Sequence, residues 1–192
     1  AAVRALVQRK LPLSMLRLSN GIETETNLTL AGHERLVSAM EKYLSWRGCS
    51  GGKCMLMLGV SADKRTARHA LREARRLLGH YGAVYIGPAM GSKWAANRFK
   101  GPYLRNTLWE LGYAADTIET AVDWPQVKPL MLAMEQAARD VFDGFGQRVH
   151  AFTHLSHLYP QGSSIYSQYV WPIAPGGFAP NFERWQAFKA AV

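Results

Sequence analysis

A long run of alternating side chains, residues 147–171, constrains the fold more than any other part of the sequence. Apolar and polar residues alternate on both sides of Pro160-Gln161-Gly162, a pattern typical of two strands joined by a turn. Residues 113–124 predict another strand. Because strands of this kind bury one face, helices elsewhere in the chain are expected to cover the sheet on that side.

Shorter segments predict the remaining elements. Strands are expected over 11–21, 54–60 and 83–87, and helices over 31–46, 64–78, 95–110, 123–144 and 181–192. The helix over 95–110 is expected to be interrupted, or to start, near Gly101-Pro102. The succession of strand, helix and strand between 54 and 87 is typical of half a ferredoxin-like unit. The predicted fold class is therefore α+β, a ferredoxin-like antiparallel sheet covered by helices.

The charge of the chain is strongly basic, with a formal net charge of +9 in 192 residues. Such a balance attracts phosphate groups on a small substrate, a membrane surface or nucleic acid. The helix expected over 64–78 carries a stripe of arginines that is either a solvated face or an anion-binding face: Arg65, Arg68, Arg72 and Arg76, with Arg75 beside them. No nucleic-acid-binding motif accompanies this stripe, so a nucleic-acid partner is not expected.

Cysteines and histidines do not predict a metal site. Cys49 and Cys54 lie in CSGGKC without the further ligands that a metal needs, and are interpreted as reduced thiols or, alternatively, a disulfide. Reduced thiols favour a cytoplasmic or other reducing compartment. His150, His154 and His157 would share one face of a helix, but on a strand His157 points away from the other two. Structural or pocket-lining histidines are the favoured interpretation.

Three segments together resemble a known family. Residues 98–124, RFKGPYLRNTLWELGYAADTIETAVDW, are similar to the PYLRD helix and the D-T-x-E-T-A strand of FAD-linked oxidases. The hairpin HLSHLYPQGSSIYSQY resembles the family's H-x-S-H-x-Y-x-x-G-x-x-x-Y signature, and SMLRLSN resembles its strand with a buried arginine. The chain is identified as a C-terminal cap domain of this vanillyl-alcohol-oxidase-like superfamily, in the branch that contains alkyldihydroxyacetonephosphate synthase.

The resemblance implies a role for three residues. Tyr166 corresponds to the family's catalytic tyrosine, and Arg105 and Arg17 correspond to its substrate-binding arginines. A guanidinium is a permanent forked donor for phosphate or carboxylate, and a phenol can exchange a proton with substrate. Simpler alternatives are a surface ion pair for Arg105 and sheet packing for Tyr166. Strand alternation puts Tyr166 on the face of Gln168, opposite Tyr169.

The resemblance also implies the organisation of the enzyme. Residues 1–192 would form one cap domain, and the FAD-binding domain and an S-H-H-H-G loop would lie outside them. FAD is therefore expected in the complete enzyme and not in this fragment, which would be inactive alone; the residues that contact FAD are not assigned. We further expect Arg17 and Arg105 to share one concave surface, away from the arginine stripe.

The resemblance implies one of two reactions. An enzyme of this branch would exchange the acyl group of acyl-dihydroxyacetone phosphate for an alkyl group, or oxidise a hydroxy acid. Expected partners are a small phosphate, carboxylate or lipid substrate and the FAD-binding domain, with a membrane surface and a second copy of the chain left open. The alternative is a non-catalytic ferredoxin-like domain that binds nucleic acid or anionic membrane through its basic helix.

Overall fold

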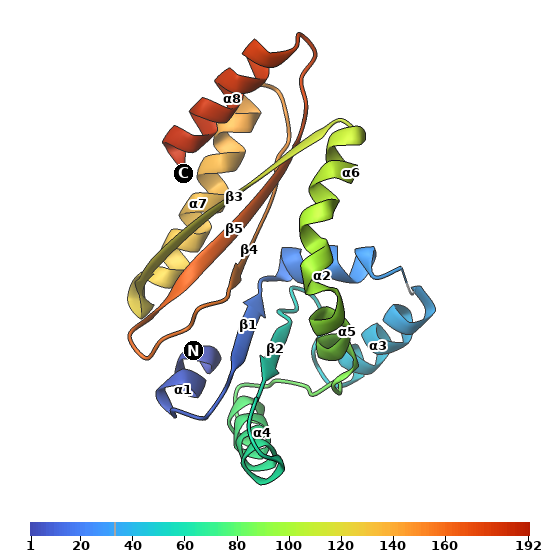
Figure 1. Cartoon of the computed structure of the whole chain (residues 1–192), viewed down its shortest axis with the longest axis vertical. Helices are drawn as coiled ribbons and strands as arrows, with labels where there is room; N and C mark the ends of the chain where they lie inside the picture. The colour runs from blue at the N-terminus through green and yellow to red at the C-terminus, as the bar shows by residue number, and fades with distance from the viewer. Residues whose placement is uncertain (33) are drawn as a thin grey trace.

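The fold is built on one five-stranded sheet, in a computed structural model that describes residues 1–32 and 34–192 (Figure 1). Its strand order is β2-β1-β4-β5-β3, and every neighbouring pair is antiparallel. The strands are β1 (Met15–Ser19), β2 (Leu56–Gly59), β3 (Tyr113–Asp123), β4 (His150–Leu155) and β5 (Gly162–Pro172). The predicted α+β class with an antiparallel sheet is confirmed.

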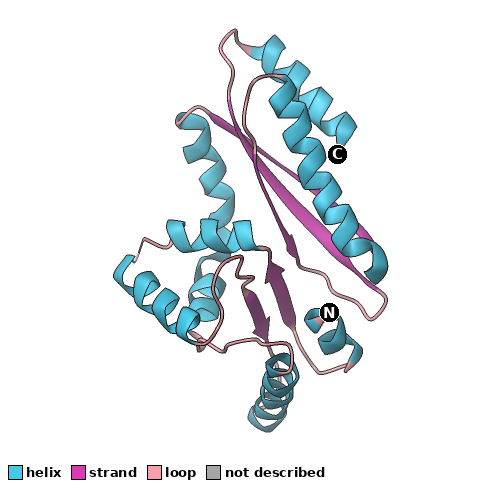
Figure 2. Ribbon diagram, turned by 180° about the vertical axis from the view of Figure 1, so that it is seen from behind, coloured by secondary structure: helices cyan, strands magenta, loops and turns pink. Residues whose placement is uncertain are grey.

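Helices surround the sheet unevenly. They are α1 (Ala2–Gln8), α2 (Gly21–Leu30), α3 (Glu34–Trp46), α4 (Lys64–Gly79), α5 (Ala89–Asn97), the 3₁₀ helix η1 (Arg98–Tyr103), α6 (Leu104–Glu110), α7 (Trp124–Gly144) and α8 (Phe178–Ala191). Figure 2 shows α7 and α8 lying together along one face of β3, β4 and β5. Among the described helices, none is both long and apolar enough to cross a membrane.

The main core lies between the sheet and the pair α7–α8. Phe142 of α7 and Phe188 of α8 are fully buried and pack on Tyr169 and Trp171 of β5. The ring centroids of Phe142 and Trp171 are 4.9 Å apart, and those of Tyr169 and Phe188 are 4.7 Å apart. Such contacts between large aromatic side chains fix this face of the sheet against its helices.

A separate cluster attaches α4 to the other end of the sheet. Ala74 and Leu78 of α4 pack with Leu6 of α1 and Leu16 of β1. The opposite side of α4 is exposed and carries the arginine stripe. Asp63 begins this helix as predicted, because its carboxylate accepts hydrogen bonds from the backbone N–H groups of Arg65 and Thr66.

The strand predicted over 83–87 is wrong. These residues form a loop that pairs with none of the described strands, and Ala83, Tyr85 and Ile86 are exposed although the segment is apolar. The ring of Tyr85 instead lies under the Arg75 guanidinium, 3.4 Å from its centre. The predicted strand–helix–strand unit over 54–87 therefore consists of β2 and α4 alone.

The other differences concern helices. Neither α1 nor α2 is predicted, and the strand expected over 11–21 ends at Ser19 because Asn20 caps α2. The helix expected over 31–46 corresponds to α3, and its position 33 lies outside the described residues. The helix expected over 95–110 is interrupted near Gly101-Pro102, as predicted: α5, η1 and α6 follow one another, with Pro102 in the 3₁₀ turn. A proline lacks the N–H that a continuous α-helix needs there.

Candidate active site on the open face of the sheet

The two faces of β5 differ in what covers them. Ile165, Ser167 and Tyr169 are fully buried on the face toward α7 and α8, whereas Tyr166 and Gln168 are partly exposed on the other face. The predicted alternation of these residues is confirmed. The face that carries Tyr166 is called the open face below, and β4 and β1 add His154 and Arg17 to it.

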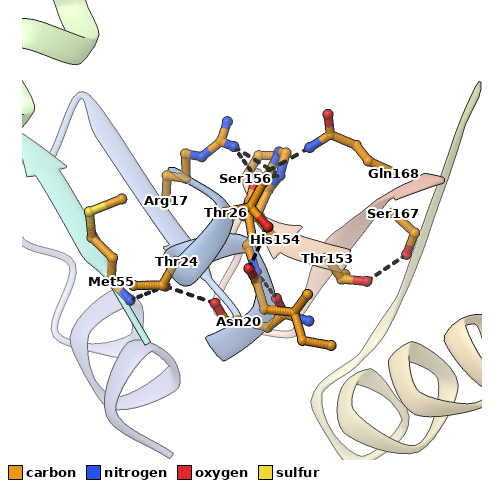
Figure 3. A network of polar contacts seen from close by, with 12 residues as sticks. Arg17, Asn20, Thr24, Thr26, Met55, Thr153, His154, Ser156, Ser167 and Gln168 are labelled. Atoms are coloured by element: carbon orange, nitrogen blue, oxygen red, sulfur yellow. Dashed lines mark hydrogen bonds and ion pairs between the residues drawn. The ribbon is translucent and has the colours of Figure 1, made fainter. Parts of the chain in front are cut away.

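Glu23 is the centre of a polar cluster on this face. Its carboxylate, 1% exposed, contacts three side chains through Oε1: Arg17 NH2 at 2.5 Å, His154 Nδ1 at 3.0 Å and Gln168 Nε2 at 3.2 Å. Figure 3 shows Arg17 and Gln168 approaching the cluster from opposite sides. Arg17, Glu23, His154, Tyr166 and Gln168 are named the open-face cluster.

The charges of this cluster are arranged to keep Glu23 ionised. Burial acts to raise the pKa of Glu23, but its contacts with His154 and Arg17 outweigh burial, and the pKa lies below its ordinary value. An ionised carboxylate in the interior is tolerated only with such partners. Glu23 therefore holds a permanent negative charge between Arg17 and His154.

Tyr166 joins the cluster through its ring. The ring centroids of Tyr166 and His154 are 4.8 Å apart with an interplanar angle of 23°, which is a stacked arrangement. The Arg17 side chain is 20% exposed, so part of its guanidinium reaches the surface beside this stack. Two of the three predicted site residues, Arg17 and Tyr166, thus belong to one cluster, with His154 between them.

A glycine fixes the register that brings Tyr166 to this place. Gly162 pairs with Asp123 at the start of the β3–β5 ladder, and a Cβ atom added to it would lie 2.1 Å from the Val122 carbonyl oxygen. No side chain fits at that distance. The glycine of the hairpin signature therefore permits close pairing of β3 and β5 four residues before Tyr166.

A second buried carboxylate lies on the helix-covered face. Glu135 of α7, 3% exposed, accepts hydrogen bonds from Thr153 Oγ1 at 2.7 Å and Asn20 Nδ2 at 2.8 Å, and Arg139 NH2 lies 3.1 Å away. The other side-chain atom of Asn20, Oδ1, accepts the Glu23 N–H at 2.8 Å. Asn20 therefore links the open-face cluster to Glu135 at the point where β1 ends.

The sequence did not point to Glu23, Gln168 or Glu135. A signal for Glu23 was present, because an Asn followed three residues later by Glu has the spacing of a helix N-terminus with a capping box. The wrong assignment of 20–21 to a strand end hid that signal. Gln168 has no local signal, since its partner Glu23 is 145 residues away. Glu135 has the local partner Arg139 four residues on, but Thr153 and Asn20, which complete its surroundings, are 18 and 115 residues away.

Arg105 is not joined to the cluster by any contact. It lies on α6, is exposed, and takes part in no hydrogen bond or ion pair within residues 1–32 and 34–192. A surface shared by Arg105 and Arg17 therefore stays a prediction. The arginine stripe faces outward on α4, as expected, where two shallow surface depressions are lined by Arg65, Arg68, Arg72 and Arg75.

The remaining histidines have separate surroundings. His150 Nε2 lies 2.9 Å from Thr26 Oγ1, and burial together with the Arg139 charge lowers the pKa of His150. His157 lies beyond the end of β4, is exposed, and has Nδ1 3.3 Å from Glu119 Oε1. In the part of the chain that the structure describes, no group of three histidine, cysteine or acidic side chains has the geometry of a metal site. Cys49 and Cys54 are free thiols.

Comparison with known proteins agrees with this fold. Residues 1–171 match the family model of the C-terminal domain of FAD linked oxidases. Alkyldihydroxyacetonephosphate synthase from Dictyostelium discoideum is 24% identical over 160 residues, which are 80% of this chain and 26% of that protein. Two solved structures of alkyldihydroxyacetonephosphate synthase match with TM-scores of 0.82 and 0.78 at 19% and 18% identity, and each match covers 99% of this chain. The chain spans about a third of the length of those structures, 35% in both cases.

Proposed function

This chain belongs to the FAD-linked oxidase family, as its C-terminal domain, and on that premise we propose that its open face forms the substrate-side wall of a flavin active site. The observation that supports this most is the open-face cluster itself. It concentrates a partly exposed arginine, a buried histidine–carboxylate pair and a tyrosine on the side of the sheet that α7 and α8 leave uncovered. Burying this ion pair costs desolvation, and groups of partly exposed and buried ionisable side chains of this kind are concentrated at functional sites.

The open face is suited to form one side of an FAD site, but not to hold FAD by itself. The open-face cluster offers donors and a stacked aromatic ring, and none of the glycine loops follows the spacing of a phosphate-binding loop. FAD, when bound against such a wall, would supply the electron acceptor for chemistry at the substrate carbon. Within this chain, the residues proposed to act are Arg17, which binds a phosphate or carboxylate of the substrate, and Tyr166, which exchanges a proton with it. Arg105 is proposed as a second anion-binding residue.

The proposed substrate class is an anionic lipid precursor. Both solved relatives and the curated relative are named alkyldihydroxyacetonephosphate synthase, and a reaction of that type requires a site for a phosphate. The net charge of +9 and the exposed part of Arg17 suit such a substrate. A hydroxy-acid oxidase would use the same guanidinium for a carboxylate.

A surface for the FAD-binding domain is proposed on η1 and α6. Large apolar side chains are exposed there: Phe99, Tyr103, Leu104, Trp109 and Leu111. Exposed apolar surface of this extent marks an interaction site. The proposed occupant is the FAD-binding domain, because the relatives are about three times as long as this chain and α6 adjoins β3 of the sheet.

The test is a pair of tyrosine substitutions in the longer protein that joins this domain to an FAD-binding domain. Tyr166→Phe should keep flavin content and fold but lower turnover by about 100- to 10,000-fold, the usual contribution of general acid–base catalysis. Tyr169→Phe is the matched control, since Tyr169 lies on the opposite face of the same strand, and should leave turnover nearly unchanged. Near-normal turnover of Tyr166→Phe at equal flavin content would remove the catalytic assignment.

The exposed arginines of α4 support a second candidate function, binding to an anionic membrane surface. Leu71 lies among these arginines and is 38% exposed, and the loop that follows α4 exposes Tyr81, Tyr85 and Ile86. Arginines interspersed with exposed tyrosine and aliphatic side chains are typical of interfacial binding. Sedimentation with vesicles rich in phosphatidylserine should bring down this chain, and Arg68→Glu with Arg72→Glu should abolish it. Binding to duplex DNA but not to vesicles would refute the membrane as partner.

A further inference from the structure

His154 has an arrangement that its role as a packing residue does not explain. Its side chain is 6% exposed, and its Nδ1 atom lies 3.0 Å from Glu23 Oε1 and 3.1 Å from Arg17 NH2. Within residues 1–32 and 34–192, the second ring nitrogen, Nε2, forms no hydrogen bond. Nδ1 is thus fixed by two contacts, whereas Nε2 can form a hydrogen bond with a ligand.

The contacts of Nδ1 decide which nitrogen carries the proton. Glu23 is an ionised carboxylate and can only accept, so its 3.0 Å contact requires a hydrogen on Nδ1. Arg17 NH2 does not compete for the Nδ1 lone pair, because the Glu23 carboxylate at 2.5 Å is a stronger acceptor for the same guanidinium. Neutral His154 is therefore an Nδ1–H imidazole, whose Nε2 lone pair is unprotonated.

We propose that Glu23 and His154 form a carboxylate–imidazole pair in which His154 Nε2 accepts a proton from a substrate hydroxyl at the open face. This inference rests on the proposed function and adds a proton acceptor to it. An orienting carboxylate on one nitrogen of a histidine that acts through the other is a recurrent arrangement in enzymes. The ligand class is an alcohol or hydroxy acid whose anionic group is bound by Arg17.

The proposed step is a simple proton transfer. The substrate O–H bond breaks, an Nε2–H bond forms on His154, and the resulting imidazolium is stabilised by the Glu23 carboxylate 3.0 Å away. Tyr166 is stacked on the imidazole and fixes the plane of its ring, and the Tyr166 hydroxyl provides a second exchangeable proton beside it. The pair thus combines a fixed orientation with charge compensation, two requirements of an efficient general base.

Other charged groups around His154 do not replace Glu23. Arg17 approaches from β1 and is itself a cation, so it cannot compensate the charge of an imidazolium. On β3, Glu119 pairs with Tyr166 in register but contacts His157. Glu135 lies on the helix-covered face and is engaged by its own donors. The single negative charge in contact with the imidazole is thus Glu23, as far as the described residues show.

The first test reads the tautomer directly and needs no activity. Long-range ¹H–¹⁵N NMR spectra of this chain, labelled on histidine, should show His154 as the Nδ1–H tautomer, with Nε2 in the chemical-shift range of an unprotonated nitrogen. In Glu23→Gln the preference should be lost, because an amide can also donate to Nδ1. His150 is the internal control, since its ring contacts Thr26 and should not change. An Nε2–H tautomer of His154 in the unsubstituted chain would overturn the proposal.

The second test uses the longer FAD-containing protein. His154→Asn keeps a donor toward Glu23 and removes Nε2, and it should lower turnover by about 100-fold or more at unchanged flavin content. A loss in Tyr166→Phe without a loss in His154→Asn would overturn the proton acceptor and leave the proposed function standing. Normal turnover in both variants would overturn the proposed function itself, whereas the tautomer measurement would still report on the pair.

Discussion

Asn20 allows the sharpest test of how the two faces of the sheet are connected. In Asn20→Ala, α2 loses its cap, because Oδ1 accepts the Glu23 N–H at 2.8 Å, and Glu135 loses a donor at 2.8 Å. Loss of a cap costs about 1 kcal/mol. Loss of a hydrogen bond to a buried charge costs about 1.5 kcal/mol at the low end of the usual range. We use this low value because Thr153 and Arg139 still contact Glu135 in the variant. The expected loss in the free energy of unfolding is therefore about 2.5 kcal/mol.

Urea denaturation followed by circular dichroism measures this loss, and thermal denaturation should show a midpoint lowered by roughly 5–10 °C for a chain of this size. Asn20→Asp separates the two contributions, because it keeps the cap acceptor and faces the Glu135 carboxylate with another carboxylate. It should lose at least as much stability as Asn20→Ala at neutral pH. The control is Asn106→Ala, on the exposed surface of α6, which should change stability by less than about 0.5 kcal/mol. An equally small change in Asn20→Ala would refute the link.

Two further predictions concern titratable groups. Burial acts to raise the pKa of Asp116, but hydrogen bonds from Lys189 and Trp185 outweigh burial and lower the pKa. The Asp116 carboxylate therefore stabilises the fold at pH values above its ordinary pKa of about 4, and this stabilisation is lost as the pH falls through the lowered pKa. The free energy of unfolding, measured from pH 6 to pH 3, should depend less on pH in Asp116→Asn. Burial raises the pKa of Tyr169 to about 12, although the nearby Ser167 acts to lower it. Because no described residue forms a hydrogen bond of good geometry with the Tyr169 hydroxyl, Tyr169→Phe should be neutral or stabilising in urea denaturation. A clear loss of stability in that variant would reveal a partner for the hydroxyl.

Much of the sheet could be predicted because apolar and polar residues alternate within its longer strands. β3 and β5 alternate, and β4 is joined to β5 by the segment that contains the turn at 160–162, whereas the pairing of β3 with β5 spans α7 and β4. The segment 83–87 shows the limit of that reasoning, since a short apolar run is a strand only if a sheet edge is available. α2 shows the opposite error. The signal for its N-terminus, Asn20, was local, but the predicted strand was extended to residue 21 and so included Asn20.

The site was predicted in part for a related reason. Arg17 and Tyr166 followed from family motifs, and their shared position on the open face follows from strand alternation and register. Glu23, which joins them, has no place in those motifs. The sequence alone does not distinguish a buried glutamate from an exposed one on a helix surface. The difference depends on partners that only the folded structure brings together. Arg105 stays outside the cluster in the residues that the structure describes.

The order of contacts within the open-face cluster suggests how the site depends on the sheet. Arg17 and Glu23 are six residues apart, and the turn at Asn20 brings them together from local structure alone. His154 and Gln168 are 131 and 145 residues from Glu23 and reach it only when β4 and β5 have paired with each other and β4 with β1. Because β1 and β4 share only two residue pairs, Leu18 with Leu155 and Ser19 with His154, that junction is the narrowest part of the sheet. Glu23 therefore does more than orient side chains: its contacts to His154 and Gln168 reinforce a short strand pairing, and the same ion pair that prepares the proposed base also holds the two parts of the sheet in register.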